Sequence, residues 1–361
     1  FLLLLILLIL NIIFSIKHYD SIKEFLGLVR YLILFLSINY CLENFENFKT
    51  NFLKILLFLV TFVCLDSYMQ YFVGIDIFGN LIETGHGRRL SGPFGDEYVV
   101  GAFVSKIAIL SLILFKNNKI YNYIFLIFFL ILVFLSNKRT ASIMLLCGVI
   151  IFFIFNDFKN KFFSLFFILS LLLVLIGMFK YDTNLKKHFI DRTLQQVGLK
   201  IDYLELSRGV ERKNILDNLY GVYFFTTINI SKNNLLTGSG IGTYRYECSK
   251  KEYSNINSIF VEERCNTHPH NIYLEILSES GLIIFSFFVV ILVILFYFLL
   301  KQYYFDKNNR HEILSYICTF IILFNPIQTT GSFFSTWNGI FYWIALSFVF
   351  FSVKKKLIHK I

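Results

Sequence analysis

The sequence predicts an all-α polytopic membrane protein, a multi-span helical bundle with one large polar loop. Hydrophobic residues make up 56% of the 361 residues, and Phe alone occurs 45 times. These residues form repeated apolar runs long enough to cross the ~30 Å hydrocarbon core of a bilayer as helices. The alternating strands of about ten residues that are typical of a membrane β-barrel do not occur.

A hydropathy window of about 19 residues predicts the spans in order along the chain. They lie near 1–16, 25–41, 51–73, 98–115, 119–135, 140–155, 161–180, 272–300, 313–330 and 338–352. The first run is already apolar at Phe1, which we interpret as a truncated span. The stretches 74–97 and 181–270 are too polar to cross. The chain is therefore divided into N-terminal transmembrane helices (1–180), a large loop (181–270) and C-terminal transmembrane helices (271–361).

The short connections that are rich in lysine predict which side of the protein faces the cytoplasm. Their cationic residues are Lys49, Lys54, Lys116, Lys119, Lys159, Lys161, Lys301, Lys307 and Arg310, followed by the tail VKKKLIHKI. They alternate consistently, so we place them in the cytoplasm. Both polar loops then lie outside, together with 136–140 and 329–337. The net charge of +10 follows this topology and does not indicate a nucleic-acid partner.

The arginines gather on the predicted outer side. They are Arg88, Arg89, Arg139, Arg192, Arg208, Arg212, Arg245 and Arg264. Membrane insertion needs no cation there, whereas a guanidinium group binds phosphate oxygens bidentately. The alternative is a solvated loop with ordinary salt bridges. We favour that alternative for Arg192, Arg208 and Arg212, whose stretch reads as one or two amphipathic helices over the bundle.

The stretch THPHNIYLEILSESGL holds candidate catalytic groups. A helix that starts near Pro269 places Asn271, Glu275, Ser278 and Glu279 on one polar stripe. Carboxylates at membrane depth face the bundle interior or a wet cavity. His268 and His270 lie at the outer end of this stripe, where an imidazole could act as general base on a hydroxyl. The alternative is a capping histidine with interfacial polar neighbours.

Three further stretches carry candidate anion-binding residues. RRLSGPFGDEYVVGAF places Arg88 and Arg89 before a Gly/Pro turn, where they could neutralise a phosphate or belong to a plain outer turn. LSNKRTASIMLL places Arg139 in a short outer connection. LLTGSGIGTYRYE contains a glycine-rich turn that could bind an anion through its N–H groups and that would carry Tyr244 and Arg245 towards the site. It lacks the context of a nucleotide fingerprint.

The cysteines of the large loop leave two possibilities open. Cys248 and Cys265 could form a disulfide if the loop faces an oxidising compartment, or could stay free. Cys265 with His268 and His270 matches no common zinc-ligand spacing, so no metal site is predicted.

Together these stretches resemble the O-antigen ligase-related proteins. The resemblance rests on LTGSGIGTY, HPHNIYLEILSESGL, GRRLSGPFGDEYVVGAF, LSNKRTASIMLL and NPIQTTGSFFSTWNGIFYW and covers residues 75–350. It implies a glycosyltransferase of the C-type fold class in the bacterial inner membrane, with its active site facing the periplasm. Its donor would be a glycan on undecaprenyl pyrophosphate and its acceptor lipid A–core or another glycan. No metal, nucleotide sugar or other cofactor is implied.

The resemblance also assigns roles by position. His270 would be the general base, with His268 beside it. Arg88, Arg89, Arg139 and Arg245 would hold the pyrophosphate, and Asn271, Glu275, Glu279 and Tyr244 would support the site.

Three functions remain open. The first is a ligase that attaches a preassembled glycan to lipid A–core, and the second is a polymerase that joins repeat units on the same carrier. The third is a transporter, for which polar or broken segments in matching halves would be expected. Pro93, Pro269 and Pro326 lie near span ends instead.

Overall fold

The computed structural model describes residues 2–83, 88–116, 118–156, 161–196, 217–258 and 260–358. Within these ranges the chain is helical, and extended segments pair only in the isolated bridges Ile75–Leu81 and Glu83–Arg89. The predicted all-α membrane fold is confirmed. Contacts divide the chain into unit 1 (Phe1–Ser37, Thr193–Ile294, Pro326–Ile344) and unit 2 (Ile38–Arg192, Leu295–Asn325, Ala345–Ile361).

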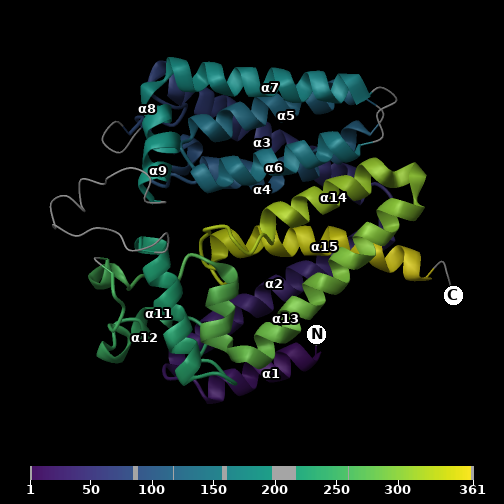
Figure 1. Cartoon of the computed structure of the whole chain (residues 1–361). Helices are drawn as coiled ribbons and strands as arrows, with labels where there is room; N and C mark the ends of the chain where they lie inside the picture. The colour runs from purple at the N-terminus through teal and green to yellow at the C-terminus, as the bar shows by residue number, and fades with distance from the viewer. Residues whose placement is uncertain are drawn as a thin grey trace. The chain divides into compact units, whose positions relative to one another are not determined.

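Unit 2 is built around a central helix. Its helices are α3 (Phe48–Val73), α4 (Val100–Ser111), α5 (Lys119–Leu135), α6 (Arg139–Phe155), α7 (Lys161–Tyr181), α8 (Thr183–Lys186) and α14 (Arg310–Leu323). A π-helical turn, η3 (Lys187–Asp191), follows α8. Short 3-10 turns are η1 (Gly92–Phe94), η2 (Leu112–Phe115) and η6 (Lys307–Asn309). The helix α4 packs against α3, α5, α6 and α14, as its apolar sequence requires (Figure 1).

Unit 1 holds most of the large polar loop. Its helices are α1 (Leu2–Ile13), α11 (Leu219–Asn233) and α12 (Tyr244–Glu247), with the 3-10 turns η4 (Lys251–Tyr253) and η5 (Val261–Glu263). The short helix α9 (Arg192–Gln196) also belongs to unit 1, except for its first residue, Arg192, which is the last residue of a segment of unit 2. Three longer helices each contain a boundary between the units, namely α2 (His18–Asn44), α13 (Ile272–Phe305) and α15 (Thr336–Ile358). The predicted loop 181–270 is therefore partly helical.

The predicted spans coincide with helices. Four are long and apolar enough to cross a membrane: His18–Asn44, Phe48–Val73, Ile272–Phe305 and Thr336–Lys354. The pair Ile168–Tyr181 and Thr183–Gln195, bent by 104°, is a candidate fifth span, and the apolar helices Leu3–Ile13, Val100–Phe115, Ile120–Leu135 and Arg139–Phe155 are shorter. The predicted span 313–330 is wrong at its end, because α14 stops at Leu323, shortly before Pro326, which lacks the N–H a helix needs.

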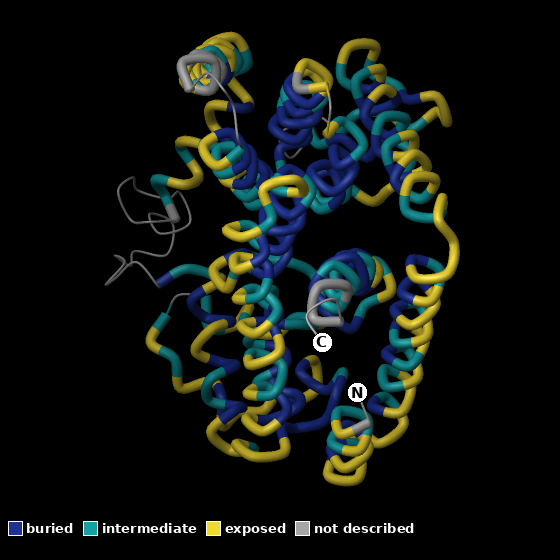
Figure 2. Tube along the Cα trace, turned by 90° about the vertical axis from the view of Figure 1, so that its right-hand side faces the viewer, coloured by how far each residue is buried: buried dark blue, intermediate teal, exposed yellow. Residues whose placement is uncertain are grey.

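Large apolar side chains remain exposed on the outer faces of these helices. Phe58 of α3 is 68% exposed and Val293 of α13 is 62% exposed. Figure 2 shows exposed stretches on outer faces and buried residues on inner faces. Contact with lipid explains this exposure, since hydrocarbon does not penalise an apolar surface.

Candidate functional site

The glycine-rich turn of unit 1 docks onto a break in α13. The helix is interrupted at Gly281, whose φ is 76°. Ser239 and Gly240 donate backbone hydrogen bonds to Ser278 and Glu279, and Leu282 donates one to the backbone of Leu235. A Cβ at Gly238, where φ is 72°, would lie 2.3 Å from the Glu279 carbonyl oxygen. Only glycine fits this position, because it tolerates both the positive φ and the close approach.

Two buried carboxylates of α13 hold neighbouring loops. Glu279 accepts the backbone N–H groups of Gly242 and Tyr244 at 2.8 and 2.9 Å. Glu275 accepts the N–H of Phe333 at 2.7 Å. The N–H groups of the turn are therefore taken up by the protein's own Glu279 carboxyl group. Both carboxylates lie on the buried face of α13, as the stripe pattern predicts, and both fix loops beside the histidines.

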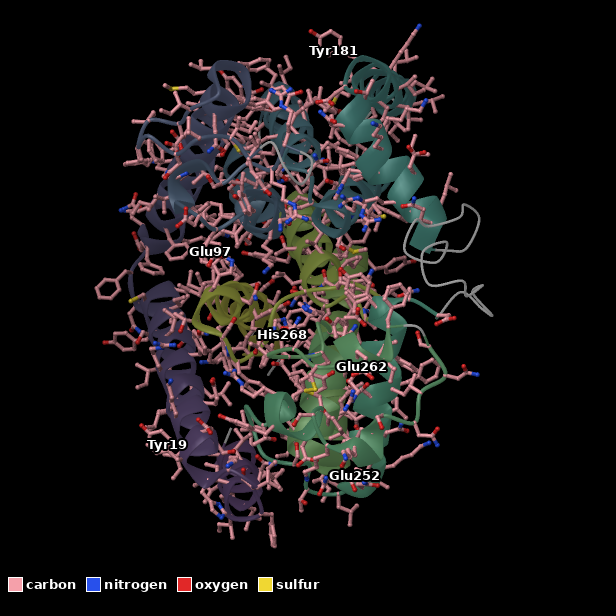
Figure 3. All side chains as sticks on the ribbon, turned by 90° about the vertical axis from the view of Figure 1, so that its left-hand side faces the viewer. Tyr19, Glu97, Tyr181, Glu252, Glu262 and His268 are labelled. Carbon is pink, nitrogen blue, oxygen red and sulfur yellow. A yellow bond between two sulfur atoms is a disulfide. The ribbon has the colours of Figure 1, made fainter. Side chains whose placement is uncertain are left out.

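The histidine loop, residues 265–271, is anchored at both ends. Cys265 forms a disulfide with Cys248, which directly follows α12, with 5.2 Å between the two Cα atoms (Figure 3). At the other end Asn271 caps α13, because its Oδ1 accepts the N–H groups of Tyr273 and Leu274. Its Nδ2 donates to the Pro326 carbonyl at 2.7 Å. The predicted helix start at Pro269 is thus wrong: Asn271 closes the first turn, and the helix begins at Ile272.

His268 and His270 form a pair with 4.4 Å between ring centroids. His270 adopts a positive φ of 57°, and its carbonyl accepts the Thr330 N–H at 2.8 Å. The ring of Tyr223 on α11 lies 5.3 Å from the His270 ring. In Figure 3 His268 lies among surrounding side chains, whereas Glu252 of the same unit lies at the edge.

Both histidines are held neutral by their surroundings. Burial lowers the pKa of His268 to about 4, and His270 and Arg245 act in the same direction. Burial also lowers the pKa of His270. A neutral imidazole is the form that accepts a proton, so these rings are in the state that general-base chemistry requires.

Tyr244 and Arg245 are neighbours in the chain but differ in burial. Tyr244 is fully buried in a cluster with Ile230, Cys248 and Tyr253, and its hydroxyl donates to the Arg264 carbonyl at 3.3 Å. It therefore belongs to the core beneath the site. Arg245 is exposed and lies close enough to His268 to influence its charge.

Glu24 of α2 was missed by the sequence reasoning. It lies near Arg245, and its Cγ would be 2.7 Å from a Cβ placed on Gly242. Its position inside an apolar helix gave no sign of this neighbour.

Arg88 in unit 2 is already engaged by the protein. Its guanidinium lies over the Tyr71 ring, 4.6 Å from the centroid, and donates to the Tyr71 carbonyl at 3.2 Å. The Tyr71 hydroxyl in turn donates to Asp182 at 2.8 Å. Gln70 fixes the following turn by accepting the N–H groups of Ser91 and Gly92. Arg88 therefore holds the loop in place.

A second group of cations converges on His188 in η3. Arg89, Arg139 and Arg192 each lie close enough to act on the charge of His188, and Arg192 Nη1 lies 3.4 Å from His188 Nδ1. Arg139 is the first residue of α6. The Nε atom of Arg89 is enclosed without a hydrogen-bond partner. The structure thus brings two predicted ligands, Arg89 and Arg139, to one place.

Arg192 and His188 are additions that the sequence reasoning missed. Arg192 is exposed at the start of α9, in keeping with a solvated helix, and it also acts on the charge of His188. Arg89, Arg139 and Arg192 are called the arginine cluster below. Nothing in one sequence shows that the segment after α7 turns back towards α6. Arg208 and Arg212 lie outside the described residues.

The predicted residues therefore fall into two groups. The histidine pair, Arg245 and the residues named as supporting belong to unit 1, and Arg88, Arg89 and Arg139 belong to unit 2. Among the described residues no three His, Cys, Asp or Glu side chains are arranged to hold a metal. Cys265 is in a disulfide and so supplies no thiolate.

The fold defines a multi-pass helical membrane protein, with the histidine pair in unit 1 and the arginine cluster in unit 2. Residues 124–289 match the family model described as O-Antigen ligase, a stretch that includes Arg139 and the histidine pair. This part of the chain is therefore similar to the O-antigen ligase family. The family implies a glycosyltransferase-like membrane enzyme that acts on a lipid-linked glycan and an acceptor. No curated protein matches the chain significantly.

Proposed function

We propose that the protein transfers a glycan from undecaprenyl pyrophosphate to a hydroxyl group of lipid A–core, on the periplasmic face of the bacterial inner membrane. The observation that carries this proposal is the neutral pair His268 and His270. The pair lies in a loop anchored by a disulfide and a helix cap, inside the stretch that matches the ligase family.

In this mechanism His270 is the general base. It takes the proton of the acceptor hydroxyl while the hydroxyl oxygen attacks the anomeric carbon of the donor sugar. The bond from that carbon to the pyrophosphate oxygen breaks, and the lipid pyrophosphate leaves with the electron pair. Because its negative charge grows in the transition state, fixed cations stabilise the transition state more than the bound donor.

The arginine cluster of unit 2 supplies those cations in our proposal. Guanidinium groups bind phosphate oxygens bidentately and stay charged at any physiological pH. Arg89 offers an Nε–H that the protein leaves without a partner.

Two observations support a periplasmic site. The positive-inside rule places the lysine-rich connections in the cytoplasm. The histidine loop is predicted on the other side of the membrane, which is the periplasmic side. The Cys248–Cys265 disulfide lies in the same loop segment as the histidines, and disulfides persist in oxidising compartments.

The test is transfer in proteoliposomes that contain purified protein, lipid-linked glycan and lipid A–core, without ATP. We expect transfer by the wild type and a loss of roughly 10²–10⁴-fold in His270→Ala, the range for removing a general base. His18→Ala, which removes an exposed histidine of α2, is the matched control and should keep its rate. Full activity of a folded His270→Ala protein would refute the assignment.

A polymerase would use the same groups to join repeat units on the lipid carrier. The family match supports both activities. A deletion strain that keeps long lipid-linked glycan but fails to attach it supports the ligase, whereas loss of chain length supports the polymerase. Movement of glycan across vesicles without transfer would indicate a transporter.

A further inference from the structure

Asn266 lies between Cys265 and the histidine pair, and its side-chain orientation is fixed by its neighbour. Its Oδ1 accepts the backbone N–H of Thr267 at 2.7 Å and lies 3.4 Å from the Thr267 hydroxyl. A backbone N–H only donates, so the atom facing it must be the carbonyl oxygen of the amide. The NH₂ group of Asn266 therefore points the other way.

That NH₂ group meets His270. Asn266 Nδ2 lies 2.9 Å from His270 Nε2 and 3.4 Å from the Tyr223 hydroxyl. An amide nitrogen has no lone pair to offer, so Nε2 of the imidazole must be the acceptor. His270 consequently carries its proton on Nδ1 and keeps a lone pair on Nε2.

The groups around His270 leave this tautomer undisturbed. The His268 ring lies 4.4 Å away, and Tyr220 and Tyr223 of α11 pack against His270 with ring centroids 6.3 and 5.3 Å away. Arg245 adds positive charge at His268. None of these groups is an anion. A backbone hydrogen bond with Thr330 acts to raise the pKa of His270, but burial outweighs it and the pKa is lowered.

We propose that Asn266 is a positioning residue that sets the tautomer of His270, with Nε2 as the basic atom. The acceptor hydroxyl then replaces the Asn266 amide as hydrogen-bond donor to Nε2, and its proton passes to that nitrogen. This inference rests on the proposed function, in which His270 is the general base. His268 serves less well, because its Nδ1 contacts the Thr267 hydroxyl at 2.9 Å and its Nε2 is enclosed.

The variant Asn266→Asp tests the proposal. One carboxylate oxygen still accepts the Thr267 N–H, so the loop is retained, while the other oxygen faces Nε2. An anion at this distance favours the protonated ring and raises the pKa of His270 by roughly 1–3 units. Because the base must be neutral, the acidic limb of kcat/KM moves to higher pH by the same amount. Asn255→Asp, which adds the same charge at an exposed position of the large loop, should leave the limb in place.

Asn266→Ala separates positioning from folding. It should lower kcat more than it raises KM, because the acceptor still binds but meets a ring without a fixed tautomer. Nitrogen NMR of ¹⁵N-histidine-labelled protein, with His270→Ala for assignment, reports the tautomer directly. We expect an unprotonated Nε2 in the wild type and a protonated one in Asn266→Asp.

The outcomes separate the two proposals. An active His270→Ala protein overturns the proposed function and this inference with it. An inactive His270→Ala protein, combined with an unshifted pH limb in Asn266→Asp or a protonated Nε2 in the wild type, overturns the role of Asn266 alone.

Discussion

Glu279 of α13 binds Gly242 of the glycine-rich turn through a hydrogen bond of 2.8 Å from the Gly242 backbone N–H to the Glu279 carboxylate. The same carboxyl group accepts the N–H of Tyr244, the first residue of α12. Two sequence motifs that lie 35 residues apart are therefore one structural unit. The turn carries Arg245 and the disulfide partner Cys248, and α13 follows the histidine loop.

The variant Glu279→Gln should destabilise unit 1. A glutamine amide turns an NH₂ group towards one of two backbone N–H groups and leaves that buried donor unsatisfied, at a cost of about 1–3 kcal/mol. Thermal unfolding in detergent measures the loss. Glu252→Gln, at an exposed position of the same unit, is the control, and equal midpoints for the two variants would contradict the anchoring role.

Removing the disulfide should loosen the histidine loop. Cys248 and Cys265 are 17 residues apart, and a loop of about that size stabilises the fold by about 3 kcal/mol when closed. The double variant Cys248→Ser, Cys265→Ser should therefore unfold at a lower temperature and transfer glycan more slowly. Reductant should lower the unfolding temperature and the rate of the wild type towards those of the double variant, and should not change those of the double variant. Cys147→Ser, at an exposed free cysteine, should respond like the wild type.

Transfer should persist into mildly acidic solution. Burial lowers the pKa of His270 below its usual value of 6.5, so the ring stays neutral as the pH falls through 6.5. Activity is lost only when the pH passes through the lowered value. A pH profile of kcat/KM measures the limb, and half-maximal activity above pH 6.5 would speak against a buried base.

Acid should weaken the fold through His268. Its pKa is about 4 in the folded protein and 6.5 when exposed, so unfolding takes up a proton between these values. Stability therefore falls as the pH drops from 6.5 towards 4 and is fully retained above 6.5. His268→Gln should flatten this dependence in thermal unfolding, and an unchanged slope would exclude His268 as its source.

Arg139→Ala should lower kcat more than it raises KM. A cation that stabilises the leaving pyrophosphate contributes mainly in the transition state, and removing one such group costs roughly 10²–10³-fold in kcat. Arg139→Lys should restore only part of the rate, since ammonium lacks the bidentate geometry. Lys187→Ala, which removes an exposed cation close to His188 in the chain, is the control. A rise in KM alone would mean that Arg139 only binds the donor.

The helices could be predicted because each apolar run marks one element. The start of α13 could not be predicted, because Asn271 was interpreted as part of the polar stripe rather than as the cap of the helix. Burial of Glu275 and Glu279 follows from helical periodicity, but their partners Phe333 and Gly242 do not. Those contacts join segments far apart in sequence, and no local pattern specifies them.

The candidate site was predicted best where residues are neighbours in the chain. His268 and His270 are two positions apart, and their ring centroids lie 4.4 Å from each other. Arg192 was assigned to a solvated stretch because its neighbours are charge-mixed, and it is exposed. Its closeness to His188 could not be predicted, because Arg89 and Arg139, which also act on His188, are far away in sequence. Asn266 was missed because an asparagine in a polar loop carries no distinguishing sign until its amide orientation is known.

A structure of the protein with bound undecaprenyl pyrophosphate glycan tests the central claim most directly. We predict that the diphosphate contacts guanidinium groups of Arg89, Arg139 and Arg192. A diphosphate held away from these arginines would contradict the account.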